Sequence, residues 1–72
     1  MMIQEIENGL LVSNVSMLTA TSHTMTLNVT MSQYLDWKQG ALIQNAMPNL
    51  SADEREFLMT GITPDEWDEA FS

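Results

Sequence analysis

The side chains able to do chemistry are few, and the first to consider is the only histidine, His23. Nucleophilic catalysis needs a nucleophile, a positioned base and a group that holds the oxyanion. With one histidine at a predicted loop tip and no cysteine, neither a Ser-His nor a Cys-His arrangement can be assembled. We therefore expect no catalytic residues and no enzyme activity, and we interpret His23 as a solvated turn residue rather than a metal ligand or proton donor. The usual structural zinc sites are excluded by the same shortage.

The second candidate is a dense acidic run close to the C-terminal end, made of Asp65, Glu66, Asp68 and Glu69. Spacings of three and four residues place Asp65 near both Asp68 and Glu69 on a helix surface. Such a group could hold a divalent cation weakly, but it lacks the glycine and the alternating ligands of an EF-hand loop. We prefer the interpretation of a solvated acidic surface, and we expect no metal and no cofactor.

Basic side chains are nearly absent, which limits the possible partners. Ten acids against two bases, Lys38 and Arg55, give a formal net charge of −8. This charge argues against direct binding to nucleic acid or to an anionic membrane surface. No apolar run approaches the roughly 20 residues that span a bilayer, and the first residues lack the basic start of a signal peptide. We expect a location in the cytoplasm.

The elements that must position these side chains begin with strands. The Asn8-Gly9 pair separates two strand-like runs and is typical of a tight hairpin, which would place Ile6 opposite Leu11. A three-residue loop over residues 21–23 would then pair Leu27 with Met17. The sequence thus predicts a three-stranded antiparallel meander whose third strand covers residues 25–31. The predicted core face consists of Met2, Ile6, Leu11, Val15, Met17, Leu27 and Val29.

The period of apolar residues changes to that of a helix at Thr30. Thr30 and Gln33 fit a capping box, and the helix that follows must end before Pro48. Gly40 either interrupts this helix or lets it pack closely against the sheet.

Two more helices are predicted beyond Pro48. Ser51 and Glu54 form a second capping box, with Gly61 placed to stop the helix. Thr63-Pro64 combines a cap with proline at the first helical position. Trp67 and the other aromatic residues at helical spacing are expected in the core, with Trp67 as an anchor of the last helix.

These elements predict an α+β fold, a three-stranded antiparallel β-meander followed by three short helices packed on one face of the sheet. The 72 residues are expected to form a single small domain, with the meander over residues 1–31 and the helical part over residues 31–72. Disulfides cannot reinforce its core, because the chain has no cysteine.

The stretch of residues 30–71 resembles small uncharacterised proteins encoded by bacteriophages, including tailless single-stranded DNA phages. The likeness rests on Gln33, Trp37, Gly40, the Leu42-Ile43-Gln44 run, Ala46, Pro48, the run of residues 54–58, the run of residues 60–64, and Glu66-Trp67. The resemblance implies a phage origin, and hence a bacterial host cell or a virion. It implies no activity, cofactor or catalytic residue.

Three functions are compatible with this sequence. The first is a small acidic interaction protein, working with a protein partner or as a homodimer, because association stabilises a core this small. The second is an inhibitor of host defence or replication proteins that occupies a nucleic-acid site with carboxylates in place of phosphates. The third is a minor virion component. The candidate interaction residues are those of an unguarded edge strand and of the acidic helix, namely Met25, Thr26, Leu27, Asn28, Val29, Thr30, Asp65, Glu66, Asp68 and Glu69.

Overall fold

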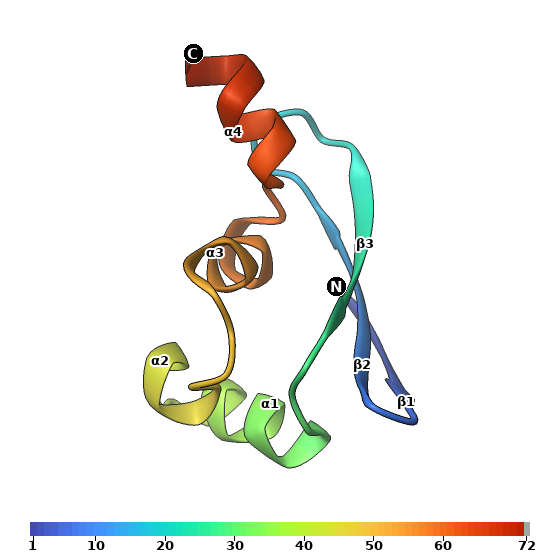
Figure 1. The fold of residues 1–72 in the computed structure, drawn as a ribbon, viewed down its shortest axis with the longest axis vertical. Coiled ribbons are helices and arrows are strands. Elements are labelled where there is room, and N and C mark those ends of the chain that lie inside the picture. Colours follow the sequence, from blue (N-terminus) through green and yellow to red (C-terminus); the bar gives the residue numbers. More distant parts are fainter. Residues whose placement is uncertain (72) are drawn as a thin grey trace.

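The predicted α+β architecture is confirmed, with a sheet at one side and helices at the other (Figure 1). The computed structural model describes residues 1–71. Three antiparallel strands in the order β1-β2-β3 come first in the chain, and the helices follow. The elements are β1 (Met2–Ile6), β2 (Gly9–Val15), β3 (Ser22–Leu27), α1 (Met31–Lys38), α2 (Ile43–Ala46), α3 (Ala52–Thr60) and α4 (Pro64–Phe71).

The core lies between the helices and the sheet face formed by Leu10, Val12 and Leu27. Phe57 and Leu58 of α3 are fully buried in this core, and Met47, which is also fully buried, belongs to the same cluster. In Figure 1 the helices all lie on the same side of the sheet, so the opposite sheet face has no helix over it.

The predicted first helix is divided in two at Gly40. The Thr30 hydroxyl accepts from the Gln33 amide and the Gln33 side chain accepts from the Thr30 amide, which confirms the capping box. Gly40 has a φ of 117°, and a Cβ there would meet no atom within 4 Å. Gly40 therefore interrupts the helix through its backbone conformation and not through close packing.

The caps of the last two helices are also confirmed. Ser51 and Glu54 form the second capping box, and Gly61 ends α3 in the left-handed conformation at φ 75°. A Cβ on Gly61 would lie 2.2 Å from the carbonyl oxygen of Val15, so the end of α3 touches the end of β2. Asn14 strengthens this junction by donating to the carbonyls of Phe57 and Leu58 at 3.2 and 3.3 Å.

The predicted strand register is wrong in both hairpins. Ile6 pairs with Gly9 instead of Leu11, so Glu7 and Asn8 form the first turn. A Cβ on Gly9 would lie 2.1 Å from the carbonyl oxygen of Leu27. Gly9 therefore lies close to the end of β3 and not at the turn tip. Leu27 pairs with Leu10 and not with Met17.

The second error comes from the turn between β2 and β3, which covers residues 16–21 instead of residues 21–23. Buried Ser16 closes this turn by accepting from the amides of Leu18 and Thr19 at 3.2 and 3.4 Å. Ala20 adopts a positive φ of 60°, which alanine rarely does. Strand β3 therefore begins earlier than predicted and ends at Leu27.

Because successive side chains alternate between faces, the register decides which residues are buried. Of the predicted core face, Leu27 and Val29 are buried, whereas Met2, Val15 and Met17 are 77%, 54% and 78% exposed. The sheet residues of the true core face are Ile3, Leu10, Val12, Met25 and Leu27.

None of the helices formed by residues 1–71 has the length and apolar character needed to cross a membrane.

Candidate functional site

The most elaborate polar cluster surrounds the carboxylate of Glu66, in the first turn of α4. Thr63 begins the cluster, because its amide donates to Glu66 Oε1 at 3.1 Å while its hydroxyl accepts from the Glu66 amide at 3.3 Å. This reciprocal pair is a capping box, and it fixes the direction of the Glu66 side chain toward the sheet. The side chain is 10% exposed.

The second carboxylate oxygen of Glu66 meets residues of the β2–β3 region. The Thr19 hydroxyl donates to Oε2, and His23 Nε2 lies 3.1 Å from the same oxygen. The hydrogen bond from the Thr19 hydroxyl, together with that from the Thr63 amide and the nearby His23 and Ser16, lowers the pKa of Glu66 to about 2 although burial opposes this shift. Glu66 is therefore ionised and joins α4 to the turn.

Two predictions about this cluster are corrected. Glu66 is not part of a solvated acidic surface, because the capping box turns it inward. His23 is not a solvated turn residue, since β3 begins at Ser22 and places the half-buried His23 beside Glu66. The carboxylate of Glu66, held by Thr19 and Thr63, connects α4 to the β2–β3 turn. Among residues 1–71, no three His, Asp or Glu side chains are grouped to hold a metal ion.

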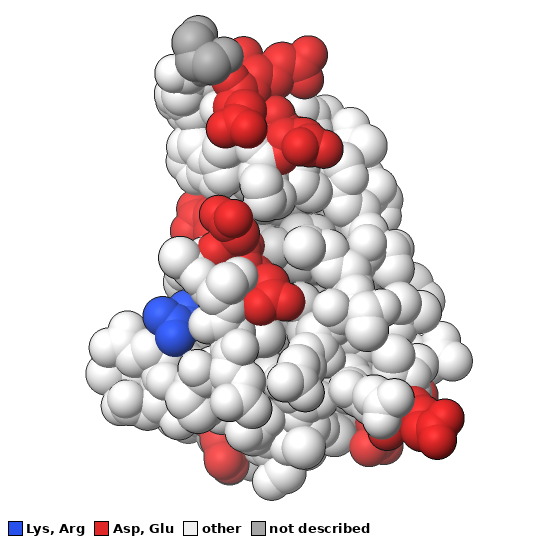
Figure 2. All heavy atoms as spheres, viewed as in Figure 1, with Lys and Arg blue, Asp and Glu red and all other residues white. Residues whose placement is uncertain are grey.

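The other acidic residues of α4 remain at the surface. Asp65, Asp68 and Glu69 are exposed, and Figure 2 shows red acidic side chains gathered over this end of the molecule. Trp67 is only partly buried and lies outside the core cluster, where it packs against Phe71 at a ring distance of 4.7 Å. The prediction of Trp67 as a core anchor is therefore wrong, because α4 packs through Glu66 instead.

The outer face of the sheet forms a second candidate surface. The pairs Met2–Ser13, Leu11–Thr26 and Val15–Ser22 place their side chains on this face, which we call the outer sheet face. It contains no charged residue. Its members are Met2, Gln4, Ile6, Leu11, Ser13, Val15, Ser22, Thr24 and Thr26.

The predicted edge-strand residues fall into two groups. Leu27 and Val29 are buried, and Met25 packs against the core. Thr26, Asn28 and Thr30 are exposed, but Asn28 follows the end of β3 and Thr30 caps α1. The edge available to a partner is therefore β3 from Ser22 to Leu27, with Thr26 as its exposed predicted residue.

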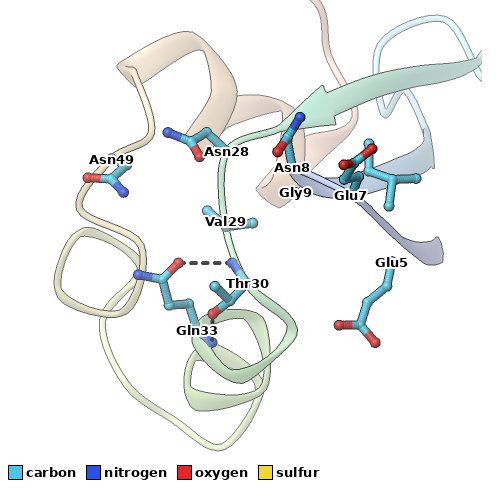
Figure 3. A pocket seen from close by; sticks show the side chains of 10 residues that line it. Glu5, Glu7, Asn8, Gly9, Asn28, Val29, Thr30, Gln33 and Asn49 are labelled. Carbon is cyan, nitrogen blue, oxygen red and sulfur yellow. Dashed lines mark hydrogen bonds between the residues drawn. The ribbon is translucent and has the colours of Figure 1, made fainter.

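A cleft of about 450 Å³ lies where the first hairpin turn meets the segment between β3 and α1 (Figure 3). In Figure 3 the side chains of Glu5, Glu7 and Asn8 lie to one side of this segment, and those of Gln33 and Asn49 lie to the other. Carboxylates and carboxamides dominate the lining, which includes no lysine or arginine. The cleft is thus unsuited to phosphate and other anions. No local sequence pattern indicates this cleft, because its residues come from separate turns.

Comparisons with protein-family models, curated proteins and solved structures found no match to this chain. Its function is therefore inferred from the geometry.

Proposed function

We propose that this chain is a small, non-enzymatic protein–protein interaction module that associates with a second copy of itself by packing the outer sheet faces of the two copies together. The observation that carries the proposal is the neutrality of this face in a chain with a net charge of −8. Met2, Ile6 and Val15 of this face are 77%, 37% and 54% exposed, which leaves apolar surface for a partner.

Charge favours a second copy as the occupant. Two copies that approach through their helical sides bring the carboxylates of α3 and α4 together, and like charges repel. The outer sheet face brings no carboxylate to the contact. A two-fold axis would place identical patches against each other, which a neutral, self-complementary surface tolerates best.

The edge of β3 offers a second arrangement for self-association, by strand pairing. Residues 22–27 contain no proline, glycine or formally charged residue that would discourage another strand from pairing. The opposite edge strand β1 carries Glu5. Pairing of two β3 strands would extend the sheet and leave the two outer faces side by side on one surface, so it is an alternative to the packing of these faces against each other.

The alternative function, imitation of nucleic acid by carboxylates, depends on the acids of α3 and α4. Two of these carboxylates make internal contacts, because Glu54 caps α3 and Glu66 is buried in its polar cluster. The neutral outer sheet face therefore supports self-association more strongly. In the same proposal, the phage resemblance implies that the module acts in the cytoplasm of a bacterial host, with a minor virion component as the alternative.

Sedimentation equilibrium over a range of protein concentrations tests the proposal. We expect wild type to be dimeric, Val15→Lys and Thr26→Lys to be monomeric, and Leu42→Lys to remain dimeric. Leu42 is a matched control, because it is 63% exposed but belongs to the helical side of the molecule. A folded wild type that stays monomeric at every concentration would refute self-association, and equal effects of all three variants would refute this surface.

A further inference from the structure

A small groove separates α4 from the β2–β3 turn, on a part of the molecule distinct from the outer sheet face. Its volume is about 170 Å³, and its lining consists of Leu18, Thr19, Glu66, Glu69 and Ala70. Thr19 and Glu66 join the two walls by their hydrogen bond, which fixes α4 against the turn. Leu18 and Ala70 supply the apolar surface.

The turn presents apolar side chains to solvent at a cost in backbone strain. Met17 and Leu18 are 78% and 43% exposed, although both follow directly after buried Ser16. Ala20 holds a φ of 60°, a left-handed conformation that alanine rarely adopts. Strain of this kind persists where the surrounding structure enforces it, and it is common at ligand clamps. Leu18 belongs to this turn and forms part of the groove wall.

The charges beside the groove are all negative. Glu69 lines it, and Asp65 lies one helical turn earlier on the same face. Asp68 does not line the groove and lies about 100° around the helix from its neighbour Glu69. The two basic residues of the chain, Lys38 and Arg55, belong to α1 and α3 and do not line the groove.

We infer that this groove binds a short basic amphipathic segment of another protein. One aliphatic side chain of the segment enters the groove between Leu18 and Ala70, and a lysine or arginine beside it pairs with Glu69 and Asp65. Charge complementarity selects this occupant, since an anionic membrane would bring negative charge to a negative rim and a second copy of the chain has only Lys38 and Arg55 to pair with it. The inference does not depend on self-association through the sheet.

Titration of the isotope-labelled protein with the peptide Lys-Lys-Leu-Leu-Lys-Lys, blocked at both ends, tests this inference by NMR. We expect amide shift changes to concentrate at Leu18 and Ala70. Two control peptides separate the contributions, one with serines in place of the leucines and one with glutamates in place of the lysines. Both should bind at least about fivefold more weakly, since each removes one half of the proposed contact.

Variants locate the contact. Glu69→Gln should weaken the lysine-leucine peptide about fivefold, whereas Asp68→Asn, the matched removal of one charge from the same helix, should leave the affinity unchanged. Both positions are exposed, and unchanged amide shifts in the core would show that the fold is retained. Equal effects of the two variants, equal binding of the serine or glutamate peptide, or shift changes away from the groove would overturn the inference. An absence of shift changes on addition of the lysine-leucine peptide would also overturn the inference. Shift changes at Leu18 that follow the protein concentration and not the peptide concentration would overturn it as well.

Discussion

At the scale of single residues, the carboxylate of Glu66 attaches α4 to the rest of the fold, a role that an apolar side chain has in most short helices. Its ionised form accepts from Thr19 and Thr63 and faces His23, so the folded state favours ionisation. The pKa falls from 4.5 to about 2, and a lowered carboxyl pKa stabilises the folded state wherever the group is ionised. This contribution is complete above pH 4.5 and is lost as the pH falls toward 2.

A pH series of chemical denaturation checks this consequence. We expect the unfolding free energy of wild type to decline between pH 4.5 and pH 2, and Glu66→Gln to show a smaller decline in that window together with lower stability at neutral pH. Asp68→Asn serves as the control, because Asp68 is exposed. Parallel pH curves for wild type and Glu66→Gln would contradict the assignment.

Two aromatic residues should differ sharply when truncated. Phe57 is fully buried in the core, so Phe57→Ala should cost about 3–5 kcal/mol and unfold much of the protein. Trp67 is only partly buried and packs mainly on exposed Phe71, so Trp67→Ala should cost clearly less. Thermal unfolding followed by circular dichroism compares the two variants. An equal loss in both would mean that α4 contributes to the core more than its packing indicates.

At the scale of elements, the junction between α3 and β2 depends on Gly61. An alanine there must hold a φ of 75° and place its Cβ 2.2 Å from the carbonyl oxygen of Val15. Gly61→Ala should therefore lower the unfolding free energy by more than about 1 kcal/mol. Gly40→Ala is the informative comparison, because it carries backbone strain at φ 117° with no atom within 4 Å of the new Cβ. Urea denaturation should rank Gly61→Ala as the less stable of the two.

How well the sequence predicts each of these elements depends on how far apart in the chain the interacting residues lie. The caps at Thr30 and Ser51 were predicted correctly, because each involves residues three positions apart in the chain. The register of β3 was predicted wrongly, because it depends on a turn that Ser16 closes and in which Ala20 is left-handed. An alanine gives no sequence signal of a left-handed conformation. The true register between β2 and β3 differs from the predicted one by an odd number of residues. This difference places most of the predicted core residues on the outer sheet face.

At the scale of the whole molecule, the candidate surfaces arise from residues far apart in the sequence. Glu66 contacts Thr19, which lies 47 positions earlier, so no local pattern could separate this buried acid from its exposed neighbours. Similarly, Met2 and Val15 were recognised as sharing a face, but which face the helices cover depends on the β2–β3 register. The composition predicted the acidity of the molecule. Only the fold shows that the outer sheet face carries no acidic residue.

The two proposed associations should respond to salt in opposite directions. Dimerisation through the neutral sheet face brings together two copies that each carry a charge of −8, so screening of their repulsion should strengthen it. Binding of a basic peptide at Glu69 depends on attraction between opposite charges, so the same salt should weaken it. Sedimentation equilibrium and peptide titration at about 0.05 and 0.5 M NaCl, where the Debye length falls from roughly 14 to 4 Å, measure both trends on one protein. Dimers that dissociate with added salt would instead indicate a contact built on charge, and peptide binding insensitive to salt would leave Glu69 and Asp65 without a part in recognition.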